Sequence, residues 1–413
     1  MTNTAILAAS ALLLFAYLLD ILGRRYRLPA VVLLIATGIV VRLILGAIGV
    51  HLHWVDPIVP VIGTRGLILI VLEGALDLTV SRARLGLIAV STTAALLGFT
   101  VTLAAFTAVF QLAFHFTLAA AALAAIPFAV ISSAVAIPSA GGLPRQPREF
   151  VIYESSLSDI LGVLVFYAWL NANGSLDSFT FDLLGGGVVS LAAAALAALA
   201  LYYFINQIEG HVRFLPLIAA LICLYAVGKE LHLSPLILVL VCGLLINNPH
   251  LITWHVKLRS LHSAGYDQTL HEFKGLVAEL TFATKSFFFL LLGYWTDLSQ
   301  MVSLDAWLVA GSGVLIIYTS RWLILKSLRQ EAVAQLMWIA PRGLITVLLF
   351  LSANETGKLA GFPFGAVMLI VLATTTLTAL AHRTARPAPA SVPVSVAPPG
   401  PAPMTGTEPI PPT

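Results

Sequence analysis

The string YESSLSDILGV, residues 153–163, places an acidic residue inside an apolar run that extends from 149 to 171. Counted from Phe150 at 1.5 Å per residue, Asp159 lies about 15 Å into a helix, near the centre of a bilayer. A carboxylate at that depth costs at least about 3 kcal/mol unless a proton, a cation or a basic partner neutralises it. The string therefore predicts a membrane-spanning helix with a functional carboxylate near its middle.

The composition around this helix excludes a soluble domain. Of the 413 residues, 59% are hydrophobic and 10% are charged, whereas soluble domains carry about 25% charged residues. Apolar stretches of about 20 residues recur along the chain, long enough to cross a bilayer of about 30 Å. They are apolar all round rather than on one face. We expect an all-α polytopic protein of the cell membrane, with no nucleic-acid partner.

The apolar stretches predict about 13 transmembrane helices. Most Lys and Arg residues fall in alternate connecting segments, and only Arg42, Arg65, Lys229 and Lys358 fall on the opposite side. Because cytoplasmic loops carry an excess of basic residues, the N-terminus is expected outside and the C-terminus inside. The expected helices are roughly 4–22, 29–48, 57–79, 85–113, 118–140, 149–171, 182–206, 213–228, 234–246, 272–297, 303–325, 331–352 and 362–382.

The composition changes abruptly after Arg386. Residues 387–413 are rich in Pro, Ala, Ser, Thr and Val, and Glu408 is their one charged residue. Such a segment cannot bury a core. We therefore expect a transmembrane domain over 1–386 and a disordered, Pro-rich cytoplasmic tail over 387–413. The two cysteines, Cys223 and Cys242, lie in apolar stretches and indicate neither a disulfide nor a metal site.

Two of the expected helices are interrupted by small residues and proline. The fifth contains the string SSAVAIP, residues 132–138, and the twelfth contains APRG, residues 340–343. The two helices would correspond in two six-helix halves of opposite orientation, joined by the seventh helix. Paired interrupted helices in matching positions point to a transport site at the midplane. We expect two inverted repeats whose discontinuous fifth and twelfth helices cross.

Several oxygen-bearing side chains are expected to gather around Asp159. Ser155 lies four residues earlier on the same helical face, and Glu73 and Ser132 lie at comparable depth in the third and fifth helices. Carboxylates, hydroxyls and freed backbone carbonyls make a hard oxygen site, which suits Na⁺ or Li⁺ better than a transition metal. The residues expected to bind the cation or the proton are Asp159, Ser155, Glu73, Ser132 and Ser158.

Three basic residues fall at membrane depth and need partners. Arg321 is placed to snorkel outward or to pair with Glu154. Arg342 interrupts the twelfth helix and is expected, with Ser133 of the fifth, to compensate the charge at the broken helix ends. Lys285 is either a second proton carrier, because a buried lysine can lose its proton, or one half of an ion pair.

The string ESSLSD, residues 154–159, resembles the E-S-L-x-N-D helix of the monovalent cation:proton antiporter superfamily, particularly its NhaP-type sodium/proton branch. Further strings carry the resemblance over nearly all of residues 5–382. Pro341-Arg342-Gly343 is similar to the family's R-G pair on its second crossing helix. KSFFF, residues 285–289, is similar to a basic-plus-FFF helix start, and LPA, residues 28–30, resembles the start of the second helix.

The resemblance implies particular roles for particular residues. Asp159 would bind a cation and a proton alternately, Glu154 would pair with Arg321, and Glu73 and Ser155 would touch the ion. It also implies a homodimer.

Two positions depart from the family pattern. Ser158 stands where the family has Asn, and the string SSA, residues 132–134, stands where the family has T-D-P. Arg342 therefore lacks the family's aspartate as a counter-charge.

The function expected from these features is secondary active transport. A monovalent cation, Na⁺ or Li⁺ first, would exchange for H⁺ by alternating access, with both ions competing for Asp159. With the neutral Ser158 beside a single acid, the exchange is expected to be electroneutral. No cofactor and no catalytic residue is expected. The alternatives are a K⁺/H⁺ exchanger or K⁺ efflux protein, and a sensor on the same fold that no longer transports. An intramembrane hydrolase is disfavoured because the histidines lie near helix ends or in loops, away from any buried serine.

Overall fold

The chain folds into packed helices, and the described residues contain no strand. The computed structural model describes residues 2–26, 28–49, 55–172, 177, 179, 187–207, 214–231, 233, 235–251, 264–330, 332–355, 357, 359 and 362–384. The expected tail at 387–413 lies outside the described residues. The expectation of an all-α protein is confirmed for the part of the chain that the structure covers.

The N-terminal part of the chain forms seven α-helices, several of which begin at a proline or a hydroxyl residue. Pro29 precedes α2, where its missing N–H loses nothing. Thr117 caps α5, its Oγ accepting a hydrogen bond from the backbone N–H of Ala120 at 3.3 Å. The helices are α1 (Thr2–Tyr26), α2 (Ala30–Ala47), α3 (Val55–Asp77), α4 (Leu85–Phe114), α5 (Leu118–Ala129), α6 (Ser133–Ser139) and α7 (Arg145–Asn171).

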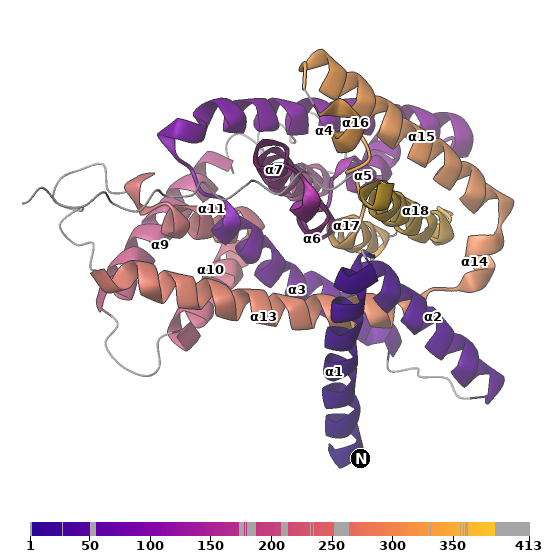
Figure 1. The fold of residues 1–413 in the computed structure, drawn as a ribbon, viewed down its shortest axis with the longest axis horizontal. Coiled ribbons are helices and arrows are strands. Elements are labelled where there is room, and N and C mark those ends of the chain that lie inside the picture. Colours follow the sequence, from indigo (N-terminus) through magenta and orange to yellow (C-terminus); the bar gives the residue numbers. More distant parts are fainter. Residues whose placement is uncertain are drawn as a thin grey trace, which may run out of the picture.

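The remaining described residues form nine more α-helices (Figure 1). Ser303 caps α15 in the same way, accepting from the N–H of Ala306 at 3.3 Å. The helices are α9 (Gly187–Gln207), α10 (Phe214–Glu230), α11 (Pro235–Asn247), α13 (Ala264–Trp295), α14 (Leu298–Val302), α15 (Leu304–Ser327), α16 (Val333–Leu336), α17 (Leu344–Glu355) and α18 (Phe364–Thr384).

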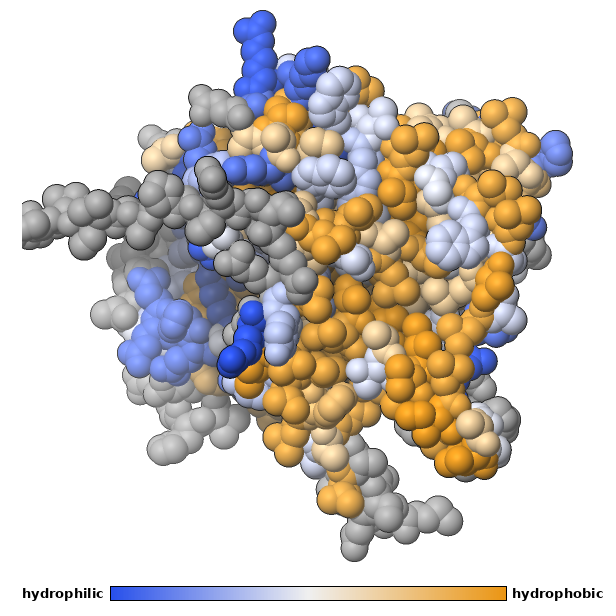
Figure 2. All heavy atoms as spheres, turned by 45° about the vertical axis from the view of Figure 1, so that its right-hand side comes forward, coloured by the Kyte–Doolittle hydropathy of each residue, from blue (hydrophilic) through white to orange (hydrophobic). Residues whose placement is uncertain are grey.

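The outer surface of this bundle is apolar. Among the described residues, eight helices are long and apolar enough to cross a membrane, and shorter apolar helices accompany them. Large side chains such as Leu14, Leu112 and Leu315 are about 70% exposed or more, and Figure 2 shows one face on which hydrophobic residues form a continuous area. Such a surface fits lipid, not water. The fold is polytopic, and the count of about 13 spans stays a prediction.

Two helical segments near the centre of the bundle are interrupted. Helix α5 ends at Ala129, Val130 is extended, and α6 begins at Ser133. The other segment breaks between α16 and α17, around Pro341. The breaks touch, because the backbone N–H of Ser132 donates to the carbonyl oxygen of Pro341 at 2.9 Å. The arrangement of the two halves as inverted repeats stays a prediction.

A glycine makes this contact possible. A Cβ atom added to Gly343 would lie 2.6 Å from the Oγ of Ser132. Real side chains do not approach so closely, so the second break needs glycine at the point where it meets the first.

The helices pack as two sets, which we call the core set and the scaffold set. The core set is α4, α5, α6, α7, α14, α15, α16, α17 and α18, and it holds both breaks. Helices α5, α6, α7, α17 and α18 lie together in the middle of Figure 1. Aromatic rings fill its interior, where Phe128 of α5 stacks on Phe106 of α4 with ring centroids 5.1 Å apart. The scaffold set is α1, α2, α3, α9, α10, α11 and α13.

The scaffold set is organised around α13, which packs against α2 and α3. Glycines let two of these backbones touch: a Cβ on Gly38 would lie 2.1 Å from the carbonyl oxygen of Leu290, and a Cβ on Gly293 would lie 2.2 Å from that of Ile35. Small residues at crossing points are how membrane helices approach closely. The contact holds the backbones of α2 and α13 close together.

Candidate cation site

Helix α7 lies beside the break between α5 and α6 and completes its hydrogen bonding. The carboxylate Oδ2 of Asp159 accepts from the backbone N–H of Ser133 at 3.0 Å. The Oγ of Ser158 accepts from the N–H of Ile131 at 2.9 Å. With the Ser132–Pro341 bond, three successive amides at the break each have a partner from elsewhere in the fold. Amides left by a broken helix must be satisfied in this way when water is excluded, so Asp159 and Ser158 hold the break in place.

The second carboxylate oxygen of Asp159 is placed differently. The side chain is buried, with 9% of its surface exposed. Among the described residues its Oδ1 has no hydrogen-bond partner, and the same holds for the Oγ atoms of Ser132 and Ser156. A buried polar atom without a partner is uncommon and requires an explanation. Such atoms are therefore candidate ligands for a cation.

Asp159 borders a small cavity at the boundary between the two helix sets. Its volume is about 20 Å³, enough for roughly one water-sized occupant. Polar side chains reach its wall from α6 and α7. The rest of the wall is glycine or hydrophobic, from α3, α7, α11 and α17. The lining residues are Ile70, Val71, Gly74, Ser133, Ser156, Asp159, Ile160, Val163, Leu164, Leu236, Ile237, Leu240 and Ile345.

Arg342 fills the space between the two breaks. It is 2% exposed. Its Nε donates to the carbonyl oxygen of Phe128 at 2.6 Å, near the end of α5, and its Nη1 donates to that of Ala340 at 3.1 Å. A cation at a helix C-terminus stabilises the partial negative charge there. Arg342 thus reaches the first break as well as its own segment. Its positive charge is stabilised by hydrogen bonds to backbone carbonyl oxygens.

Glu154 and Arg321 form a two-pronged ion pair between α7 and α15. Arg321 Nη1 donates to Glu154 Oε1 at 2.9 Å and Nη2 donates to Oε2 at 3.0 Å. Arg321 Nε also donates to the carbonyl oxygen of Leu336 at 2.8 Å. The side chains are 3% and 5% exposed. Paired donors on a carboxylate fix both distance and orientation, so this pair fastens α7 to α15 and α16 and does not snorkel outward.

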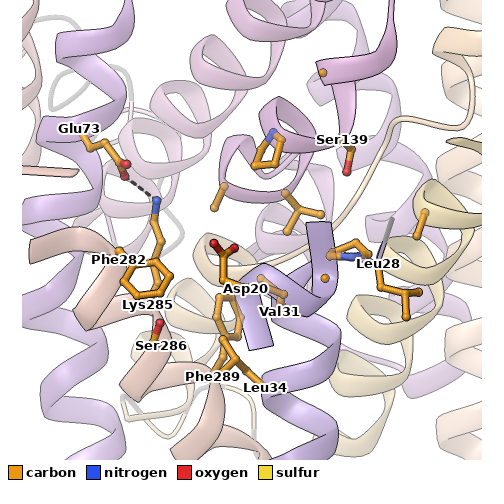
Figure 3. Close-up of a pocket in the computed structure, with 18 of the residues that line it drawn as sticks. Asp20, Leu28, Val31, Leu34, Glu73, Ser139, Phe282, Lys285, Ser286 and Phe289 are labelled. Atoms are coloured by element: carbon orange, nitrogen blue, oxygen red, sulfur yellow. Dashed lines mark hydrogen bonds and ion pairs between the residues drawn. The ribbon is translucent and has the colours of Figure 1, made fainter. Parts of the chain in front are cut away.

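Glu73 and Lys285 form a second ion pair, between α3 and α13. Both line a cavity of about 610 Å³ that also has walls from α1, α2 and α6. Figure 3 shows the pair at one side of this cavity, with the carboxylate of Asp20 pointing into it from α1. Of the two possibilities for Lys285, the structure has the ion pair. Glu73 points into this large cavity and not into the small one beside Asp159.

The structure does not bring all five expected ligands together. Ser155 donates its hydroxyl to the carbonyl oxygen of Val151 at 2.7 Å and does not line the small cavity. The Oγ of Ser158 accepts a hydrogen bond from the N–H of Ile131 at the break. Ser132 packs against Gly343, and Glu73 forms an ion pair with Lys285. The reasons are local: a serine in a helix readily donates to the carbonyl oxygen four residues back, and the partly buried carboxylate of Glu73 pairs with the nearby cation of Lys285.

Two residues that border these cavities were missed from the sequence. Ser156 lies three residues before Asp159, a spacing that shares a face as well as four does. Asp20 is a lone carboxylate in an apolar helix, which was itself a signal. Among the described residues, no group of three or more His, Cys, Asp or Glu side chains is placed to hold a metal ion.

A buried carboxylate beside two touching helix breaks, in a lipid-facing helical bundle, is the arrangement of a secondary transporter. A family model described as "Sodium/hydrogen exchanger, transmembrane" matches residues 10–383. The chain belongs to the sodium/hydrogen exchanger family. It is therefore a multi-pass protein of the cell membrane that exchanges a cation for protons, and it is not an enzyme.

Solved structures show the same fold. The sodium proton antiporter MjNhaP1 from Methanocaldococcus jannaschii at pH 8 superposes with a TM-score of 0.72 and 18% identity, covering 93% of this chain and 99% of that one. An electron-microscopy map of the same antiporter gives a TM-score of 0.69 at 19% identity, with 92% and 96% covered. No curated protein matches the chain in sequence. The family match confirms the resemblance to the cation:proton antiporters, and these structures show that the fold is the one of an NhaP-type antiporter.

Proposed function

We propose that this protein exchanges Na⁺, or Li⁺, for H⁺ by alternating access, with Asp159 as the residue that binds both ions. The observation that carries the proposal is the asymmetric carboxylate. Oδ2 accepts a hydrogen bond from the N–H of Ser133, whereas Oδ1 has no partner among the described residues, and Asp159 lines a cavity the size of one small occupant. A buried carboxylate needs a proton or a cation. Either neutralises Asp159, and the cavity has room for only one at a time.

Competition for one charge produces obligatory exchange. Asp159 crosses between the two sides of the membrane carrying Na⁺ or H⁺, because the charged form without either ion is too costly to move through an apolar boundary. One carboxylate therefore moves one positive charge in each direction. Ser158 adds no charge, and Glu73 is already neutralised by Lys285. The exchange is electroneutral.

The division into two helix sets supports alternating access. The small cavity has one wall from α6, α7 and α17 of the core set and another from α3 and α11 of the scaffold set. Within the core set, the Glu154–Arg321 pair and the carbonyl bonds of Arg342 fasten α7, α15 and both breaks into one unit. Sliding this unit against the scaffold carries Asp159 with it. The family resemblance adds a homodimer, whose formation is measured by light scattering of the detergent-solubilised protein.

The test is proton flux in proteoliposomes with a preset pH gradient. Wild type and Asp159→Asn are compared while Na⁺, Li⁺ or K⁺ is added. Glu149→Gln is the matched control, because it makes the same change on the same helix at a carboxylate that pairs with Arg84 and Arg145 away from the site. Na⁺ or Li⁺ collapses the gradient with wild type and the control but not with Asp159→Asn.

Other outcomes would replace the proposal with a stated alternative. A gradient collapsed by K⁺ alone indicates a K⁺/H⁺ exchanger, and K⁺ flux that carries current without protons indicates a K⁺ efflux protein. Proton flux through Asp159→Asn as fast as through wild type makes this carboxylate structural. No flux with any of the three ions, from well-folded protein, indicates a sensor that does not transport. A current driven by a Na⁺ gradient contradicts electroneutral exchange.

A further inference from the structure

Two neighbouring serines of α7 are both buried, yet their hydroxyl groups are placed differently. Ser155 donates to the carbonyl oxygen of Val151 at 2.7 Å. Ser156 is 2% exposed, and its Oγ has no hydrogen-bond partner among the described residues. A serine in a helix has a partner available in the carbonyl four residues back. Ser156 does not use it, so its hydroxyl is left open at a buried position.

The hydroxyl of Ser156 belongs to the same small cavity as Asp159. Both residues line it, and their spacing of three puts them on one face of α7. Asp159 Oδ1 and Ser156 Oγ are two of the three buried side-chain atoms without a partner in the described part of the chain. The third, Ser132 Oγ, belongs to a residue that does not line this cavity and packs against Gly343.

The residues around these two oxygens indicate which kind of ligand they bind. The side chains of α3, α11 and α17 that reach the cavity are aliphatic, apart from the glycine at position 74. A cation that loses its water in such a place must find oxygen atoms in the protein, and a hard monovalent cation takes hydroxyl and carboxylate oxygens readily. The N–H of Ser133 already occupies Oδ2 of Asp159.

We propose that the hydroxyl of Ser156 is a ligand of the transported cation, beside Oδ1 of Asp159 in the cavity between α7 and the scaffold set. This inference rests on the proposed function. A cation needs several oxygen ligands, whereas a proton on Asp159 needs one. Ser156 therefore strengthens binding of the cation and leaves binding of the proton nearly unchanged, which makes it a determinant of their competition.

The experiment compares three serine-to-alanine variants in proteoliposomes. Ser156→Ala removes the proposed ligand. Ser155→Ala removes the neighbouring hydroxyl, which the sequence alone favoured. Ser91→Ala is the control, because Ser91 is equally buried on α4 and its hydroxyl faces the backbone of Phe150. For each, the apparent KM of the cation that wild type exchanges, the maximal rate and the pH dependence are measured.

Ser156→Ala is expected to raise the apparent KM roughly tenfold to a hundredfold, as for loss of one bond to a charged group. Its maximal rate at saturating cation stays near that of wild type. Since protons then compete better, inhibition at low pH begins at a higher pH, and excess cation reverses it. Ser91→Ala changes none of these. If Ser156 were merely structural, the variant would have a lower maximal rate. The pH at which inhibition begins would then not shift in a way that excess cation reverses.

Thermal unfolding without transport gives a second readout. Because Ser156→Ala removes a buried hydroxyl with no partner in the described part of the chain, the variant without cation is as stable as wild type or more so. Added Na⁺ stabilises wild type by mass action, and Ser156→Ala needs a correspondingly higher Na⁺ concentration for the same rise in Tm.

The outcomes separate this inference from the proposed function. If wild type exchanges Na⁺ and Asp159→Asn does not, but Ser156→Ala matches Ser91→Ala, then Ser156 is no ligand and only the further inference is lost. A KM increase in Ser155→Ala without one in Ser156→Ala moves the ligand to Ser155. If wild type neither exchanges nor is stabilised by any of the three cations, both proposals are overturned.

Discussion

The guanidinium of Arg342 lies 2.6 Å from the carbonyl oxygen of Phe128, across the gap between the two interrupted segments. Removing it strands buried carbonyls at the end of α5. We expect Arg342→Gln to lower the free energy of unfolding by roughly 3 kcal/mol, measured by thermal or denaturant unfolding in detergent. Arg342→Lys is expected to lose less, since it keeps the charge. Arg145→Gln, at an exposed arginine, should change stability very little.

The buried ion pair of Glu154 and Arg321 is predicted to be structural. Each single change, Glu154→Gln or Arg321→Gln, leaves one buried charge alone and is expected to destabilise the protein by about 3–5 kcal/mol. The double variant should lose clearly less than the sum, because it leaves no unpaired charge. Unfolding of all four proteins completes the cycle, and strictly additive losses would contradict a direct pair. If it folds, the double variant Glu154→Gln/Arg321→Gln should keep the wild-type KM for the cation.

Glu73 is predicted to balance Lys285 and not to bind the ion. The pair is about one quarter exposed at the edge of the large cavity. The double variant Glu73→Gln/Lys285→Gln removes both charges together and is expected to exchange with a KM within about twofold of wild type. Glu73→Gln alone should do worse than the double variant, because it leaves Lys285 uncompensated beside the ion path. A tenfold rise in KM in the double variant would restore Glu73 as a ligand.

The competition at Asp159 fixes the sign of the pH dependence. As pH falls, protons occupy the carboxylate, so the apparent KM for the cation rises, by up to about tenfold per pH unit. At saturating cation the rate recovers, because the cation displaces the proton. Initial rates across a grid of pH and cation concentration test this. If lowering the pH reduced the maximal rate while KM stayed constant, the proton that inhibits transport would bind to a residue other than Asp159.

The sequence predicted the helical, lipid-facing character of the fold well, since this depends on local pattern. Long apolar stretches predict helices, and SSAVAIP and APRG mark the two interruptions. Asp159 was found because a carboxylate in such a stretch is costly. The family resemblance pairs Glu154 with Arg321, and Arg321 Nη1 lies 2.9 Å from Glu154 Oε1.

The partners of individual side chains were harder to predict. Glu73 and Lys285 are 212 residues apart, and only the packing of α3 on α13 puts them in contact. Ser155 and Ser156 both share a face with Asp159, and spacing alone cannot tell which hydroxyl turns back to its own helix. The break between α5 and α6 engages Ser158, which an unbroken helix would leave without that partner.

The hydrogen bond from the N–H of Ser133 makes the two carboxylate oxygens of Asp159 inequivalent. The two oxygens are chemically alike in solution but become distinct here, since one is committed to a backbone amide. Under the proposed exchange, sodium and the proton therefore contend for the lone pairs of a single atom, Oδ1. A half-turn of the carboxylate would break the hydrogen bond from the N–H of Ser133 to one oxygen and form the same bond to the other. The selectivity of the site is therefore independent of which oxygen binds the ion.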